Sequence, residues 1–225
     1  MIPLNLEEEH ITHKMGYYRR RSNLLMEIKE ESPDRYFIKS FDIVDTVNVP
    51  NQLNELVSDL GGLDLLVICS GIGDPNPHLD FLVEKQVIET NVLGFTAVAD
   101  WAFSHFERNG AGHLVAITSI AGLRGNRVGL SYSATKSYQI KYLEGLRQKV
   151  NRVKQPIFIT DIRPGFVDTA MAKGDKLFWV ASVDKAVQQI YRAIRRRRKV
   201  AYITRRWFTV AMVYKALPSW IYDRM

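Results

Sequence analysis

Four side chains that could handle a proton are spread along the middle of the sequence. Ser119 ends a short apolar run, and Tyr132 follows thirteen residues later. Lys136 comes four residues after Tyr132, so the two side chains share one face if this segment is helical. Asn91 lies further upstream, inside a long helical pattern. A phenol beside an ammonium, with a hydroxyl and an amide nearby, could carry out acid–base chemistry on a bound molecule.

Short apolar runs alternate with longer helical patterns around these residues. The runs predict strands at 36–40, 63–68, 113–118, 156–161 and 200–203. The longer patterns predict helices at 49–60, 83–108, 131–153 and 183–197. A further strand at 13–18 and a helix at 22–30 are expected near the start. This alternation is typical of an α/β fold with a doubly wound parallel sheet, whose ligands lie at the carboxyl ends of the strands.

The ordered set of Asn91, Ser119, Tyr132 and Lys136 resembles the catalytic tetrad of the short-chain dehydrogenase/reductase family. A lone Tyr-x-x-x-Lys pair is weak evidence, since chance alone supplies about 0.6 such pairs at this composition. The four residues together, at the usual separations of the family, are far more specific. The resemblance covers residues 18 to 203 and implies a single Rossmann-like domain over residues 1–225.

The resemblance also implies the chemistry, which is hydride exchange between a nicotinamide cofactor and a carbonyl or alcohol. Tyr132 would be the acid or base, and Lys136 would lower its pKa and bind the nicotinamide ribose. One positive charge ~4 Å away supplies about 4 kcal/mol, roughly three pKa units, while burial of the phenol acts in the opposite direction. Ser119 would polarise the substrate oxygen, and Asn91 would anchor a water that relays protons to Lys136. No metal is implied.

Cofactor contacts follow from the resemblance position by position. Asp42 resembles the aspartate that contacts adenine, and Thr169 the residue that bonds the carboxamide. Gly71 ends a Cys-Ser-Gly run where the family has Asn-Ala-Gly. Arg20 and Arg21 lie where basic residues favour NADP over NAD, although they could also be a solvated run that opens a helix.

The glycine-rich phosphate loop of the family, and the strand before it, have no counterpart in the sequence. Residues 1–12 are expected to be the remnant of the first helix, and the sheet is expected to lack an interior strand, which exposes an edge on each side of the gap. The run Ser70-Gly71-Ile72-Gly73 follows the wrong strand and precedes two prolines, so it is not a phosphate loop.

Two functions are therefore open. The first is an NADP-dependent oxidoreductase for a hydrophobic carbonyl or alcohol, because the segment after Thr169 carries apolar side chains that could cover such a substrate or could simply pack on the core. Those side chains are Met171, Leu177, Phe178 and Trp179. The second is a non-catalytic or inactive binding or scaffold protein with the same fold, which the missing phosphate loop favours.

Assembly into a homodimer or homotetramer is implied by the family, through the two long helices. One helix carries an apolar stripe that could instead pack on the sheet. Its members are Tyr138, Tyr142, Leu146 and Val150.

The net charge of +7 is concentrated near the C-terminus, which argues against a broad nucleic-acid-binding face. Residues 204–225 form a C-terminal extension in which basic residues precede the aromatic-rich segment 207–214. That composition suits peripheral contact with an anionic membrane surface, or a helix that folds back over the substrate cleft. The single cysteine, Cys69, and the lack of a targeting segment favour a cytoplasmic location.

Overall fold

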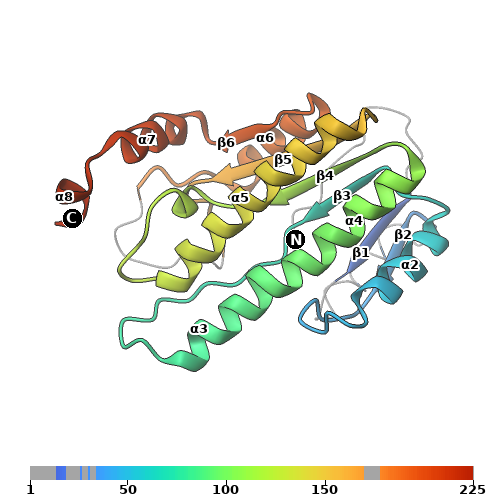
Figure 1. The fold of residues 1–225 in the computed structure, drawn as a ribbon, viewed down its shortest axis with the longest axis horizontal. Helices are drawn as coiled ribbons and strands as arrows, with labels where there is room; N and C mark the ends of the chain where they lie inside the picture. Colours follow the sequence, from blue (N-terminus) through green and yellow to red (C-terminus); the bar gives the residue numbers. More distant parts are fainter. Residues whose placement is uncertain (1–13, 19–25, 27–29, 31–33, 170–177, 225) are drawn as a thin grey trace.

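The computed structural model describes residues 14–18, 26, 30, 34–169 and 178–224. Strands and helices alternate along the chain, as the sequence predicts (Figure 1). The strands of the described residues are β1 (Met15–Tyr18), β2 (Tyr36–Lys39), β3 (Leu65–Ile68), β4 (Gly112–Ile117), β5 (Ile157–Pro164) and β6 (Val200–Ile203). The helices are α2 (Val49–Leu60), α3 (Phe81–Ile88), the π-helix η1 (Glu89–Gly94), α4 (Phe95–Asn109), the 3₁₀-helix η2 (Ile120–Leu123), α5 (Leu130–Val153), α6 (Val183–Arg195), α7 (Arg205–Ala216) and α8 (Ser219–Tyr222).

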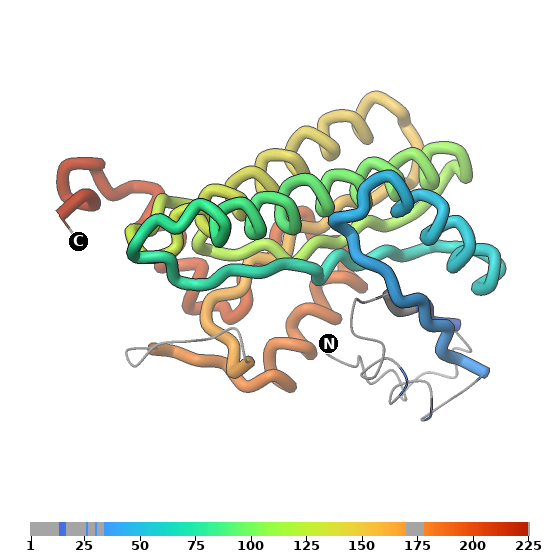
Figure 2. The backbone as a smooth tube through the Cα atoms, turned by 90° about the horizontal axis from the view of Figure 1, so that it is seen from below, coloured from blue at the N-terminus to red at the C-terminus, as the bar shows by residue number. Residues whose placement is uncertain are grey.

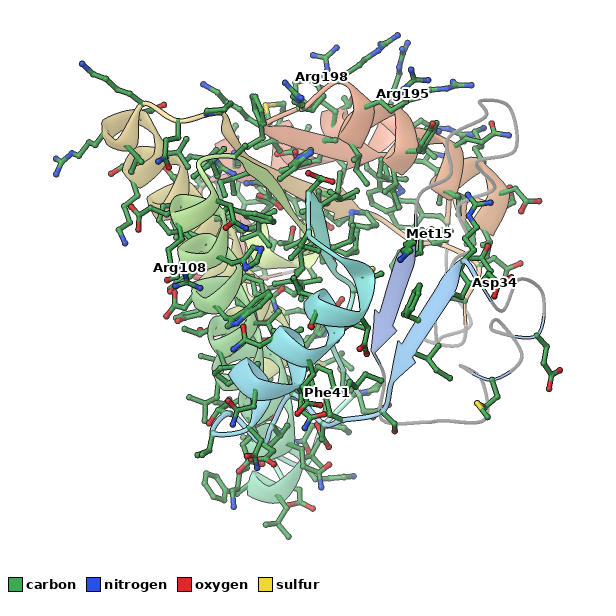
Figure 3. The ribbon with its side chains drawn as sticks, turned by 90° about the vertical axis from the view of Figure 1, so that its right-hand side faces the viewer. Met15, Asp34, Phe41, Arg108, Arg195 and Arg198 are labelled. Carbon is green, nitrogen blue, oxygen red and sulfur yellow. The ribbon has the colours of Figure 1, made fainter. Side chains whose placement is uncertain are left out.

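All strand pairs within the two sheets are parallel, but the strands fall into two hydrogen-bonded sheets. One holds β3-β4-β5-β6 in that order, and the other holds β1 and β2. Figure 3 shows β1, which begins at Met15, beside β2 and apart from the larger sheet. Among the residues that the structure describes, no strand pairs with the second edge of β1 or of β3. The predicted α/β class is confirmed, and the gap lies where the sequence lacks a strand.

Helices cover both faces of the larger sheet. The side chains of β4 alternate between these two faces. Leu114 and Ala116 face the main core, which α2, α4 and α5 complete. Val115 points the other way, into a second cluster with Ile190 and Ile194 of α6. Figure 2 shows α4 and α5 on one side of the sheet and α6 on the other. The burial on both faces explains why β4 reads as a continuous apolar run rather than an alternating one.

Several boundaries differ from the prediction by a few residues, and two of the differences have local reasons. β5 continues beyond Asp161 to Pro164, because its last residues pair with β6. The helical pattern at 83–108 begins earlier, at Phe81, where the Asp80 side chain accepts a hydrogen bond from Leu82 N at 2.9 Å. Residues 1–12 lie outside the described residues, as does most of the expected helix at 22–30, in which Met26 and Glu30 are helical.

The C-terminal extension packs against the loop after β4. The guanidinium of Arg124 donates to Leu217 O at 2.9 Å and stacks 4.3 Å from the centre of the Tyr222 ring. The Tyr222 hydroxyl donates to Gly125 O. These contacts fix α7 and α8 at the end of the sheet toward which the strands of the larger sheet point (Figure 1).

Candidate active site

The tetrad residues converge beyond the carboxyl ends of β3 and β4. Ser119 lies two residues beyond β4, and its side chain interacts with the phenol of Tyr132 in the first turn of α5. Lys136 lies one turn further along α5, with Nζ 5.8 Å from the centre of the Tyr132 ring. A Cβ added at Gly71 would lie 3.3 Å from both Asn91 Oδ1 and Lys136 Nζ. The structure therefore brings all four predicted catalytic residues, and Gly71, into one place.

Asn91 sits in the π-helix η1, a form that is often found at functional sites. The side chain is fully buried and clamps the loop after β3, because Oδ1 accepts from Ile72 N at 2.9 Å and Nδ2 donates to Ile72 O at 2.7 Å. Nδ2 also lies 3.1 Å from Thr135 Oγ1 on α5. Asn91 thus joins the loop after β3 to the helix that carries Tyr132 and Lys136.

Lys136 is almost completely buried, at 4% exposure. Nζ donates to Ile117 O and to Gln139 Oε1, both at 3.0 Å. Burial lowers the pKa of Lys136 to about 8, although electrostatic interactions with Cys69 and Asp161 act to raise it. An ammonium has three N–H donors, so one remains for a ligand such as a ribose hydroxyl.

The pKa of Tyr132 is raised above its ordinary value, because the desolvation of the phenol outweighs the hydrogen bond with Ser119. The lowering that the sequence predicts from Lys136 does not occur in this structure. Its ammonium is held by Ile117 O and Gln139 instead. Tyr132 is consequently a phenol, and not a phenolate, near neutral pH. Ser119 also accepts a hydrogen bond from Ala121 N at 3.1 Å, so it caps η2 as well as contacting Tyr132.

Gly73 is a site residue that the sequence reasoning missed. A Cβ at this position would lie 2.2 Å from Cδ2 of the Tyr132 ring, so only glycine lets the loop after β3 pass beside the phenol. The glycines at 71 and 73 are visible in the sequence as a pair. Gly73 lines the ring of Tyr132, whereas Gly71 approaches Asn91 and Lys136.

Gln139 and Asp161 were also missed. Gln139 is 1% exposed, and its Nε2 donates to Asn91 O at 2.9 Å while its Oε1 accepts from Lys136. Asp161 on β5 accepts from Thr118 Oγ1 at 2.5 Å and pairs with Arg163 at 2.6 Å. The i+3 spacing of Gln139 from Lys136 was the available sequence signal, since it places both on one face of α5.

The remaining predicted cofactor residues either make only local contacts or lie outside the described residues. Asp42 follows β2 and accepts from Val44 N at 3.1 Å, which closes a turn. Thr169 is exposed, and its hydroxyl donates to Val167 O at 3.3 Å. Arg20 and Arg21 lie outside the described residues. The residues that the structure does describe fit the nicotinamide end of a cofactor, through the remaining N–H of Lys136. They offer no glycine-rich cradle for its phosphates.

Comparison with known proteins decides the family. The sequence model described as "short chain dehydrogenase" matches residues 10–177, most of the chain. The chain belongs to this family. An uncharacterized oxidoreductase of Mycobacterium tuberculosis is 30% identical over 187 residues, which cover 79% of this chain and 73% of that protein. This short-chain dehydrogenase is accordingly an oxidoreductase.

Solved structures agree with the fold. Serine dehydrogenase from Escherichia coli is 26% identical and superposes with a TM-score of 0.63, covering 68% of this chain and 72% of its own. A short-chain dehydrogenase from Streptomyces avermitilis is 19% identical, with a TM-score of 0.76 over 90% of this chain and 82% of its own.

Proposed function

We propose that this short-chain dehydrogenase uses NADP and transfers hydride between nicotinamide and a hydrophobic carbonyl or alcohol. The observation that carries the proposal is the partly buried constellation in which Ser119 interacts with Tyr132 beside the buried Lys136. A bound nicotinamide would supply or accept the hydride. Lys136, with its remaining N–H, would hold a ribose hydroxyl, and Ser119 and Tyr132 would bind the substrate oxygen.

In this proposal Tyr132 donates its phenolic proton to the carbonyl oxygen as the hydride arrives at the carbonyl carbon. The raised pKa keeps Tyr132 protonated near neutral pH, which suits a proton donor better than a base. The phenolate left behind is stabilised by Ser119, whose interaction with Tyr132 acts to lower the pKa of the phenol.

A matched pair of tyrosine variants on α5 tests the catalytic assignment. Tyr132→Phe removes the proton donor and should abolish turnover with a normal fold. Tyr138→Phe removes a hydroxyl that lies 2.8 Å from Thr96 Oγ1, away from the tetrad, and should remain active. Unchanged carbonyl reduction by Tyr132→Phe would refute the assignment.

The preference for NADP rests on the arginines at positions 20 and 21. Only NADPH carries the 2′-phosphate that a guanidinium fork would bind. The double replacement of Arg20 and Arg21 by alanine should therefore weaken NADPH more than NADH, measured by nucleotide fluorescence. An equal loss for both contradicts the preference. Failure of the unmodified protein to bind either nucleotide would favour the non-catalytic alternative.

An apolar substrate is supported by aromatic side chains beside the segment that follows Thr169. Phe166, Phe178 and Trp207 pack together with ring centres 5.2 to 5.9 Å apart. Phe178 and Trp179 are still about half exposed, which leaves apolar surface for a ligand to cover. A panel of carbonyls of rising hydrophobicity, compared by kcat/KM, tests this part: a preference for small polar carbonyls would contradict it.

We also propose that α7 contacts an anionic lipid surface. Trp207 and Ala211 are buried against the protein, as the fold-back alternative expected. The opposite face of α7 nevertheless exposes Phe208, Met212 and Val213. No helix among the described residues is long and apolar enough to cross a membrane. The apolar face suits a helix that lies in the plane of the interface.

Charge complementarity favours lipid over another occupant. Arg205, Arg206 and Lys215 are exposed on α7 itself. Each cation near an anionic surface contributes about 1 kcal/mol. The protein should sediment with phosphatidylglycerol vesicles at low salt and not with phosphatidylcholine vesicles.

A pair of phenylalanine variants distinguishes binding through this surface from non-specific binding to vesicles. Phe208→Asp should abolish co-sedimentation, whereas Phe81→Asp alters an even more exposed phenylalanine on α3 and should not. Indifference to anionic vesicles, or self-association through α7 instead, would refute the lipid contact.

A further inference from the structure

The side chain of Gln139 forms hydrogen bonds to both Lys136 and Asn91, two of the four tetrad residues. Its Oε1 accepts from Lys136 Nζ at 3.0 Å, and its Nε2 donates to the main-chain oxygen of Asn91 at 2.9 Å. The resemblance to the family implies a relay water between Lys136 and Asn91. In this chain the amide of Gln139 makes that connection directly.

We propose that Gln139 is a positioning residue which replaces the relay water, fixes the Lys136 ammonium and closes the inner end of the proton path. This inference rests on the proposed function for its catalytic consequence, but not for its structural one. The bridge is a property of the protein alone, so it can be tested without turnover.

Burial makes the bridge a firm one. Gln139 is 1% exposed, Lys136 4% and Asn91 0%, so water does not compete for these contacts. Both functional atoms of the Gln139 amide are used, one as acceptor and one as donor. With Ile117 O as its second acceptor, Lys136 is held from two directions. Its remaining N–H is therefore fixed in direction toward the ligand.

A primary amide differs from water in what it can do with a proton. A water molecule can accept a proton from one neighbour and pass another to the next. The Gln139 amide accepts a hydrogen bond at Oε1 and donates one at Nε2, but passing a proton between them would require an unstable imidic acid. Tyr132 thus gives its proton to the substrate oxygen and regains one from water on the substrate side, and not through Asn91.

The charge state of Lys136 depends on groups from several elements. Asp161 on β5 and Cys69 after β3 favour the ammonium, while burial disfavours it and brings the pKa to about 8. Tyr132 faces it from the preceding turn of α5. From η1 and β4 come no titratable contacts to Nζ in the described residues, only the neutral Asn91 and the carbonyl of Ile117. Removal of the Gln139 oxygen withdraws a direct acceptor and should lower the pKa further.

Two substitutions of Gln139 and one control on the same helix provide the test. Gln139→Leu removes both hydrogen bonds at similar volume, and Gln139→Glu replaces the acceptor by a carboxylate. Gln148→Leu makes the same change at an exposed position of α5. The probe is [13Cε]-lysine NMR across pH 6 to 11 without cofactor, with the Lys136 resonance assigned by its loss in Lys136→Met.

The Lys136 resonance should titrate about one pH unit lower in Gln139→Leu and at least one unit higher in Gln139→Glu, with Gln148→Leu unchanged. In the active protein the alkaline limb of the kcat profile should move in the same directions, while KM for the carbonyl stays nearly constant. If neither Gln139 variant moves the resonance although circular dichroism shows a native fold, the bridge does not control Lys136 and the inference is overturned.

The two proposals fail in different ways. Absence of turnover in the unmodified protein refutes the proposed function. The NMR titration then still tests the role of Gln139. A shifted resonance with an unmoved kcat profile overturns the part of the inference that concerns the proton path. If Gln139→Leu changes neither the kcat profile nor the titration of the Lys136 resonance, both the control of Lys136 and the role in the proton path are overturned.

Discussion

Replacement of Gly73 by alanine should disable Tyr132 without unfolding the protein. A Cβ at Gly73 would lie 2.2 Å from Cδ2, 2.7 Å from Cγ and 2.8 Å from Cε2 of the Tyr132 ring. Ordinary contacts between carbon atoms begin at about 3.5 Å, so the ring or the loop must move by about 1.3 Å. A displacement of ~1 Å at a reacting group can cost about 10²-fold in rate. We therefore expect kcat to fall by about two orders of magnitude.

Gly145→Ala is the matched control, because it lies on the same helix as Tyr132 and a Cβ there meets no atom within 4 Å. It should keep full activity and gain up to about 1 kcal/mol of stability, since alanine loses less conformational freedom than glycine in a helix. Steady-state carbonyl reduction gives kcat, and urea unfolding gives the free energy of each variant.

A Gly73→Ala protein with unchanged kcat and unchanged stability would show that the loop after β3 does not position Tyr132. A large loss of stability alone would not show whether Tyr132 has moved. The Gly73→Ala and Gly145→Ala proteins are therefore also compared by the pKa of Tyr132. This pKa is followed by phenolate absorbance at 295 nm, with Tyr132→Phe as the reference that lacks the signal. Displacement of the ring toward solvent should bring that pKa down toward ~10.

Three further predictions concern stability and assembly. Burial lowers the pKa of His113 to about 4, so protonation of this side chain favours the unfolded chain. The free energy of unfolding should therefore drop by about 3 kcal/mol as the pH falls from 6.5 to 4. The His113→Gln variant should lack this drop. Gly165→Ala should destabilise by about 1–3 kcal/mol in urea unfolding, because its Cβ would lie 2.1 Å from the buried Trp207 ring; equal stability of the variant would mean that Trp207 does not pack there. Light scattering should find a dimer at micromolar concentration, and Tyr138→Lys should yield a monomer, because Tyr138 stacks on Tyr142 at the partly exposed face of α4 and α5; a monomeric unmodified protein would contradict this.

The apolar stripe on α5 shows how one pattern can serve two purposes. Leu146 belongs to the core of this chain, and Tyr142 and Val150 pack against it. Tyr138 remains 36% exposed. The sequence predicted the stripe but could not apportion it between the sheet and a second subunit, because period 3.6 marks an apolar face without saying what covers it.

Local patterns determined most of the fold. Apolar runs with β-branched residues mark the strands, and the positions of Asn91, Ser119, Tyr132 and Lys136 along the chain identify the family. These signals are short-range, because a strand buried on both faces must be apolar and a pair at i and i+4 must share a helix face. The gap in the sheet was expected from the resemblance to the family, whose first strand and glycine-rich loop have no counterpart in the sequence.

Only the tertiary structure decided what surrounds the tetrad. Gln139, Gly73 and Asp161 come from α5, the loop after β3 and β5, and their contacts join residues up to 59 positions apart, as in the approach of Gly73 to Tyr132. The pKa of Tyr132 moved against the prediction for the same reason. The sequence shows that a lysine is near, but burial and the direction of its ammonium depend on every element packed around it.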